Sequence, residues 1–144
     1  METQNYSNHR RVVPPFHFFV LPLFFLTLIG SGVNLYLSWG DHERMYSASL
    51  IVVLALCGML GTLFGRIFAL KAQDRAIRAE ENLRHFALTG KLLDPALSMR
   101  QIIALRFAPD VEFVPLASRA AAGKMEPDAI KRAIKNWRPD NDRA

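Results

Sequence analysis

Hydrophobic residues are distributed unevenly along the chain and divide it into an apolar half and a polar half. No Asp, Glu, Lys or Arg occurs from Val12 to Gly40 or from Met45 to Gly65. Within these stretches, Phe16–Leu37 and Met45–Gly65 are predominantly apolar runs of 22 and 21 residues. As helices, both would exceed the roughly 30 Å thickness of a bilayer's hydrocarbon core. The pattern therefore predicts two transmembrane helices, joined as a hairpin, in an all-α integral membrane protein.

Six segments are expected from this pattern. They are an N-terminal tail (1–13), transmembrane helix 1 (14–38), a short external, periplasmic loop (39–46), transmembrane helix 2 (47–69), a juxtamembrane helical extension (70–89) and a helical tail (90–144). Lys and Arg flank the outer ends of the two runs, whereas the loop contains only Arg44 beside Asp41 and Glu43. Because basic residues favour the cytoplasmic side, both termini are predicted to be cytoplasmic.

The first run has a second interpretation, a cleaved signal peptide preceded by Arg10 and Arg11. The run is longer than the usual 7–15 residues of a signal core, which favours a retained span. Cys57 is the single cysteine, so a disulfide within the chain is excluded, and its thiol is expected to pack as a small apolar group.

Four small residues of the second run are the predicted helix-packing positions: Cys57, Gly58, Gly61 and Gly65. Three of them recur every four residues, a spacing that lets helix backbones approach closely in lipid. Two interpretations remain open, packing within the hairpin and contact between two copies of the chain.

The second run passes into a polar helical pattern with no proline or loop signal before Thr89 and Gly90. Acidic residues precede basic residues by four positions in the pairs Asp74–Arg78, Glu80–Arg84 and Glu81–His85, an order that supports a helix. We therefore expect one continuous helix that crosses the membrane and projects into the cytoplasm, with a glycine cap at its end.

Basic residues lie where this helix would leave the membrane: Arg66, Lys71, Arg75 and Arg78. Anionic headgroups attract such side chains by about 1 kcal/mol each, so contact with the bilayer surface is predicted. The projecting part of the helix is either a solvated stalk or a docking surface for a partner protein.

The segment FALKAQDRAIRAEENLRHFALTGKLLDPALSMRQIIALRFAPD, followed by AIKRAIKNWRPD, resembles a family of small bacterial two-span membrane proteins of unknown function. Members of that family sometimes carry the label of a transporter permease. The resemblance covers nearly the whole chain from NHRRVVPPFHF onward. It implies a bacterial inner-membrane protein and supplies no reaction and no catalytic residue.

The tail is expected to form three short helices separated by turns. The first covers residues 98–107 with Ser98 as its cap, the second covers 110–124 with Asp110 as its cap and Gly123 near its end, and the third covers 127–137 and opens at Pro127. In the last helix, Ile130, Ile134 and Trp137 form an amphipathic face with Ala133.

Three interpretations of the tail compete. Its apolar faces pack on one another as a small helical cap, its last helix lies on the membrane surface, or its helices bind another protein. Residues 90–144 contain ten Lys and Arg against seven Asp and Glu, an excess too small to favour nucleic-acid binding.

Residue patterns typical of catalysis are missing from the sequence. The four histidines (9, 17, 42 and 85) fall on different sides or at different depths of the predicted membrane arrangement. There is no metal-ligand spacing, phosphate-binding glycine loop or nucleophile motif. No cofactor, no metal and no enzymatic activity are therefore expected.

The sequence favours a small accessory or scaffold subunit that binds a larger membrane complex or itself. The alternative is a homo-oligomeric component of a transport system, since two spans enclose a pathway only when several copies assemble. Lipids with anionic headgroups and a membrane-protein partner or a second copy are the expected binding partners.

Overall fold

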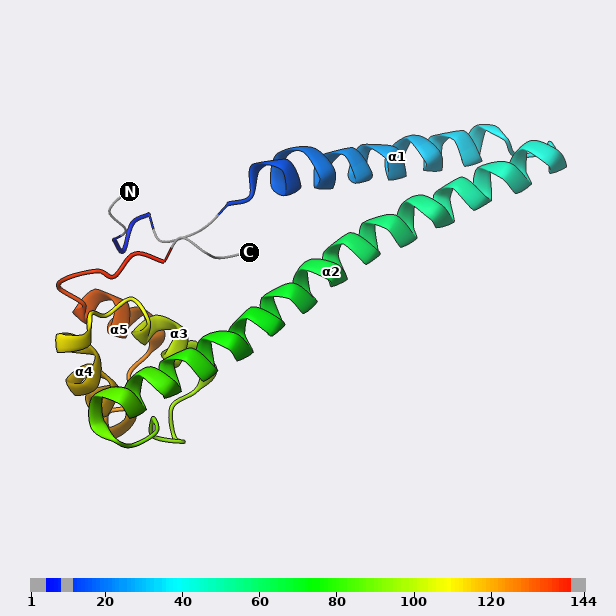
Figure 1. Cartoon of the computed structure of the whole chain (residues 1–144). Helices are drawn as coiled ribbons and strands as arrows, with labels where there is room; N and C mark the ends of the chain where they lie inside the picture. The colour runs from blue at the N-terminus through cyan, green and yellow to red at the C-terminus, as the bar shows by residue number, and fades with distance from the viewer. Residues whose placement is uncertain (1–4, 9–11, 141–144) are drawn as a thin grey trace. The chain divides into compact units, whose positions relative to one another are not determined.

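The computed structural model describes residues 5–8 and 12–140, which form a π-helix and five α-helices (Figure 1). They are η1 (Pro15–Val20), α1 (Leu21–Leu37), α2 (His42–Thr89), α3 (Met99–Leu105), α4 (Asp110–Ala122) and α5 (Pro127–Ala133). No β-strand occurs in either described range. The chain divides into two compact units, a hairpin unit (Val12–Ala69) and a head unit that contains the residues from Leu70 onward and the described residues before Val12.

In the hairpin unit, η1, α1 and the first part of α2 form an antiparallel pair joined by a tight turn (Figure 1). Gly40 takes a φ of +93° in this turn, a conformation that glycine adopts without steric cost. Two helical stretches, Pro15–Leu37 and His42–Thr89, are long and apolar enough to cross a membrane. The prediction of an all-helical protein with two candidate spans is therefore confirmed.

The more buried positions of the hairpin unit recur at alternating spacings of three and four residues. On α1 and its C-cap they are Phe24, Leu28, Ser31, Leu35 and Ser38, and on α2 they are Met45, Ala48, Val52, Ala55, Met59 and Thr62. Such spacing places one continuous face of each helix against the other, as in two-stranded helix packing. Small residues such as Ser31 and Ala48 let the two backbones come close.

The first span begins as a π-helix, in which the backbone N–H of Leu21 donates to the carbonyl of Phe16. Pro22, in the first two positions of α1, directly follows this π-helix and removes one backbone N–H from the helical stretch Pro15–Leu37. The helix nevertheless continues without interruption to Leu37.

A single 48-residue helix, α2, extends from the hairpin unit into the head unit. It ends where Gly90 adopts a φ of +73° and donates its N–H to the carbonyl of Phe86 at 2.7 Å. This is the left-handed glycine cap expected at a helix C-terminus. The predicted continuous helix ending at Thr89 is confirmed.

The core of the head unit comes from α3, α4, α5 and one face of α2. Its largest fully buried side chains are Phe107, Phe113, Ile102, Leu105 and Ile130. Ile77 of α2 belongs to the same cluster, so the apolar faces of the tail pack on one another and on α2. Of the three interpretations of the tail, the structure supports the helical cap.

Local sequence signals explain most of the helix ends in the tail. The Ser98 hydroxyl accepts a hydrogen bond from the N–H of Gln101, and the Gln101 side-chain oxygen accepts one from the backbone N–H of Ser98, which completes a capping box. Gly123 ends α4 and Pro127 opens α5, both as predicted.

Two predictions about the tail are wrong. Asp110 does not cap α4, because Pro109 occupies the cap position and the Asp110 carboxylate binds Arg84 instead. The last helix stops at Ala133 rather than continuing to Trp137, because Ile134 adopts an extended conformation.

Candidate functional site

The four predicted helix-packing residues have different surroundings in the structure: Cys57, Gly58, Gly61 and Gly65. A Cβ atom added at Gly58 would lie 2.6 Å from the ring of Phe24 on α1, so only glycine allows this approach. Cys57 is exposed, and a Cβ atom at Gly61 or Gly65 would find open space among the described residues. Within one chain, the hairpin contact therefore uses Gly58, and a packing role for the other three remains a prediction.

The basic residues at the proposed membrane surface have different surroundings. Arg66 lies half-buried in the hairpin unit with its guanidinium 5.0 Å from the ring centre of Phe16. Lys71, Arg75 and Arg78 are exposed on α2, and no described residue forms an ion pair with them. The last three are therefore available to an external anionic partner.

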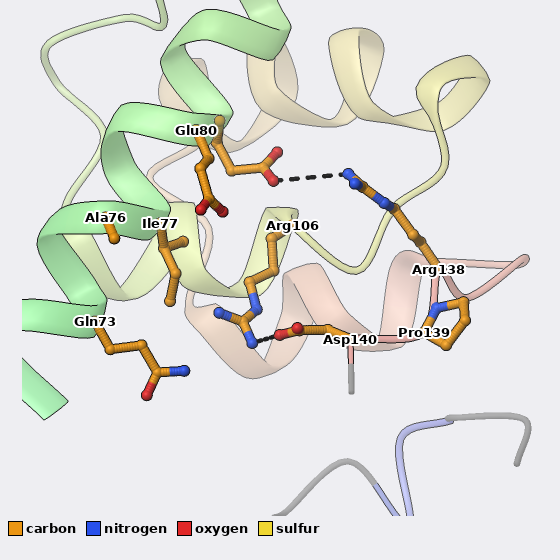
Figure 2. Close-up of a pocket in the computed structure, with 9 residues that line it drawn as sticks. Gln73, Ala76, Ile77, Glu80, Arg106, Arg138, Pro139 and Asp140 are labelled. Carbon is orange, nitrogen blue, oxygen red and sulfur yellow. Dashed lines mark ion pairs between the residues drawn. The ribbon is translucent and has the colours of Figure 1, made fainter. Parts of the chain in front are cut away.

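A charged cluster in the head unit lies where α2 faces the end of the tail (Figure 2). Its members are Glu80, Glu81, Arg84, Arg106, Asp110, Arg138 and Asp140. They border a cavity of about 350 Å³ and a neighbouring hollow on the Arg84 side. The sequence did not single out this cluster, because its residues come from four separate parts of the chain.

Arg84 contacts several groups in and around this cluster. Its guanidinium donates to Glu81 at 3.0 Å, to Asp110 at 2.7 Å and to the carbonyl of Ala108 at 2.8 Å. It also lies 4.3 Å from the ring centre of Phe113. Arg84 therefore connects α2 to Ala108 and to Asp110 and Phe113 at the start of α4.

Two further ion pairs attach the C-terminal segment to this cluster. Arg138 approaches the buried carboxylate of Glu81 at 3.9 Å, and the buried Arg106 pairs with Asp140 (Figure 2). The backbone N–H of Arg138 also donates to the carbonyl of Phe107 at 2.7 Å. The segment after α5 is therefore held along the head unit by both charge and backbone hydrogen bonds.

These ion pairs differ from those predicted for the helix surface. Arg84 pairs with Glu81 rather than Glu80, because Glu81 is buried against the head core whereas Glu80 is exposed at the edge of the cavity. The Nδ1 atom of His85 lies within hydrogen-bonding distance of the Lys91 carbonyl oxygen, at 2.7 Å, and the His85 ring packs edge-on against Phe113. An i,i+3 pair within α2 thus replaces the expected Glu80–Arg84 pair, and a contact with Lys91 replaces the expected Glu81–His85 pair.

Glu112 holds the same C-terminal segment at another point. Its carboxylate accepts hydrogen bonds from the backbone N–H groups of Lys135 and Asn136 at 2.9 and 3.0 Å, and from the Asn136 side chain. The hydrogen bond from the Lys135 backbone is the main reason that the pKa of Glu112 lies below its ordinary value of 4.5.

Arg132 on α5 reaches the N-terminal segment. It donates to the hydroxyl of Tyr6 at 3.2 Å, and this contact raises the pKa of the guanidinium above its ordinary value. The guanidinium remains charged at any physiological pH.

The predicted amphipathic face of the last helix is inside the head unit. Ile130 is 0% exposed and Ile134 is buried beside it, although Ile134 lies beyond the end of α5. Trp137 packs against Phe107 with ring centres 5.0 Å apart. These three residues therefore serve the core, and the structure leaves no amphipathic face on α5 for a membrane surface.

Exposed apolar residues occur on the side of α2 that faces away from the head core, where no site was predicted. Leu83 and Phe86 are 68% and 51% exposed, although they belong to a unit rich in charge. The sequence shows that Leu83 and Phe86 continue the helical spacing of the alanines at positions 72, 76 and 79. It does not show which side of α2 packs against the head core.

Within the residues described, no group of three His, Cys, Asp or Glu side chains is placed to hold a metal ion. The class that the structure defines is a small all-helical protein with two candidate membrane spans and an ion-paired helical head. The chain belongs to a family of unknown function (DUF6526), whose model matches residues 1–144. This match confirms the resemblance to a family of unknown function. Comparison with curated proteins and with solved structures gave no match.

Proposed function

We propose that this protein is a small accessory or scaffold subunit of the bacterial inner membrane, anchored by its hairpin unit and presenting its head unit in the cytoplasm. The observation that supports this proposal is the exposure of large apolar side chains all around the hairpin. They include Phe19, Leu26, Leu54 and Phe68, with Leu54 73% exposed. Such a surface is unfavourable in water and stable in a hydrocarbon solvent.

The expected orientation supports a cytoplasmic head. The turn between the spans contains a single basic residue, Arg44, which pairs with Asp41. Lys71, Arg75 and Arg78 follow the second span and are exposed for contact with anionic headgroups or an acidic partner. Both chain ends are thus proposed to lie inside the cell.

The continuity of α2 supports a scaffold role. The helix begins in the hairpin unit, which carries both candidate spans, and contributes its last residues to the head unit. Arg84 and Ile77 then bind the rest of the head to this helix. A partner bound to the head would therefore be held at the membrane.

The location is tested by cysteine labelling of intact bacterial cells. In a Cys57→Ala background, Asp41→Cys is expected to react with a membrane-impermeant maleimide added outside, whereas Lys124→Cys reacts only after lysis. Labelling of Lys124→Cys in intact cells, or recovery of the chain in the soluble fraction, would contradict the proposed topology.

The scaffold role is tested by affinity isolation through a C-terminal tag in mild detergent, followed by mass spectrometry and measurement of particle mass. A larger membrane protein at fixed stoichiometry is the expected result. A particle that contains several copies of this chain and nothing else would contradict the accessory role and favour a homo-oligomeric transport component.

A further inference from the structure

An exposed apolar stripe runs along α2 on the side opposite the head core. We call this set the open face: Ala72, Ala76, Ala79, Leu83 and Phe86. The buried residues Ile77 and Glu81 point toward the tail helices, about half a helical turn away from the open face. The head unit leaves this side of its longest helix exposed, and only Ala76 of the open face also borders the cavity beside Arg106 and Asp140.

The spacing of the open face is that of a two-stranded coiled coil. Its members follow one another at intervals of four, three, four and three residues. This repeat corresponds to the a and d positions of a heptad, with Ala76 and Leu83 at a and the other three at d. The three alanines permit close approach of a second helix, and Leu83 and Phe86 supply apolar area that such a helix would bury.

Charges beside the open face identify the occupant. In this register, Arg75 takes a g position and Glu80 takes the next e position. Both are exposed, and neither forms an ion pair with any described residue. In a parallel pair of helices, a g residue lies beside the next e residue of the other helix. Arg75 of each copy therefore lies beside Glu80 of the other.

We propose that the open face binds the open face of a second copy, forming a parallel dimer flanked by two symmetric Arg75–Glu80 ion pairs. An antiparallel pair would match e with e and g with g, which does not bring these charges together. The parallel direction rests on the proposed function, because two copies anchored in one membrane project their α2 helices to the same side. The proposed scaffold subunit would therefore act as a dimer of this chain.

Disulfide cross-linking of the full chain in native membranes tests the contact. In a Cys57→Ala background, Ala79→Cys places thiols at facing d positions, and mild oxidation is expected to yield a dimer. Arg78→Cys is the matched control, exposed and one residue away but at a c position that faces outward. Equal cross-linking of the two variants, or a cross-link from Ala79→Cys to a different protein, would overturn the proposal.

Charge exchange tests the register independently. Arg75→Glu or Glu80→Arg alone replaces two attractions with two repulsions and is expected to lower cross-linking of Ala79→Cys roughly five- to thirtyfold. The double exchange should restore it. Arg100→Glu, the same change of charge at an exposed residue of α3, should leave it unchanged.

Co-expression of the two single exchanges identifies the partner as a second copy. With different tags, the Arg75→Glu chain and the Glu80→Arg chain should cross-link to each other in preference to themselves. A random mixture of the three pairs would overturn the proposal. Sedimentation of the same samples tests the membrane anchor separately from the dimer. Recovery of the chain in the soluble fraction would contradict the membrane anchor. A membrane-bound chain that forms no Ala79→Cys dimer would contradict only the dimer.

Discussion

Arg84 and Glu81 show how single residues hold the head unit to α2. Glu81 is 4% exposed, so its carboxylate has lost nearly all contact with water and depends on Arg84 and Arg138 for compensation. A guanidinium can donate to several acceptors in one plane, which lets Arg84 reach Glu81, Asp110 and the Ala108 carbonyl together.

Removal of the Arg84 side chain should therefore destabilise the head unit. For Arg84→Ala we expect a loss of about 3 kcal/mol in the free energy of unfolding, since a buried carboxylate is left without its main partner. Arg84→Lys keeps the charge but not the three-way contact, so a smaller loss is expected. Thermal unfolding in mild detergent measures both. Arg78→Ala is the control, and a similar loss there would contradict the assignment.

Glu112 makes the stability of the head unit depend on pH. Its pKa in the folded chain lies below the ordinary value of 4.5, chiefly because the Lys135 backbone N–H binds the charged form. The stabilisation is therefore present above pH 4.5 and is lost as the pH falls through the lowered pKa.

Glu112→Gln should reduce the slope of stability against pH below 4.5 and leave the head slightly less stable at pH 7. Acid titration of the unfolding temperature measures this dependence. Glu126→Gln serves as the control, because the Glu126 side chain makes no hydrogen bond in the described part of the chain. Identical acid profiles for Glu112→Gln and the parent chain would contradict the role of Glu112.

At the scale of an element, α2 has different neighbours on different sides. One side packs against α1 in the hairpin unit, with Phe24 seated over Gly58. In the head unit, one side contributes Ile77 to the core, and the opposite side carries the open face. A helix with several apolar sides has little overall amphipathicity, so its sequence pattern alone does not tell which side meets which neighbour.

The hairpin contact predicts different outcomes for two glycines of α2. Gly61→Ala should be neutral or stabilising, because open space surrounds it among the described residues and alanine favours a helix. Gly58→Ala should be less stable than Gly61→Ala by about 1–2 kcal/mol, because its methyl group would meet the Phe24 ring at 2.6 Å. Thermal unfolding in detergent compares the two variants.

A second substitution separates this clash from a general effect on the helix. Phe24→Leu removes the ring edge that meets position 58, so it should reduce the difference between the two alanine variants. A difference that persists unchanged in the Phe24→Leu background would contradict the contact.

At the scale of the whole molecule, the head unit includes the last part of α2 as a component of its core. Ile77 is buried among residues of the tail helices, and the charged cluster joins α2 to α4 and to the C-terminal segment. The tail is therefore not an independent domain appended to a stalk. Its core is complete only with the α2 side chains in place.

Ile77→Ala should consequently unfold the tail more readily, with a loss of about 2–5 kcal/mol typical of a buried isoleucine. Limited proteolysis of membranes, read at sites beyond Gly90, is expected to show faster cleavage. Ile67→Ala, a substitution of an exposed residue on the same helix, is the matched control. Equal protease resistance of the two variants would contradict the contribution of Ile77 to the core.

The sequence by itself determined the features that depend on local chemistry. The two charge-free runs, the uninterrupted helix to Thr89, the Gly90 cap, the Ser98 capping box and the helix start at Pro127 are all short-range signals. Each acts within a few residues through backbone hydrogen bonds or side-chain polarity, so a linear pattern is sufficient to find it.

Only the tertiary structure decided which side of each helix meets which neighbour. In the structure Arg84 pairs with Glu81 and Asp110, and α5 ends at Ala133 with Ile134 buried. Phe24 lies over Gly58, and Leu83 is exposed on the open face. These outcomes depend on contacts between residues distant in the sequence, where packing and desolvation outweigh local helix preference. No periodicity along α2 could have distinguished its buried face from its open face.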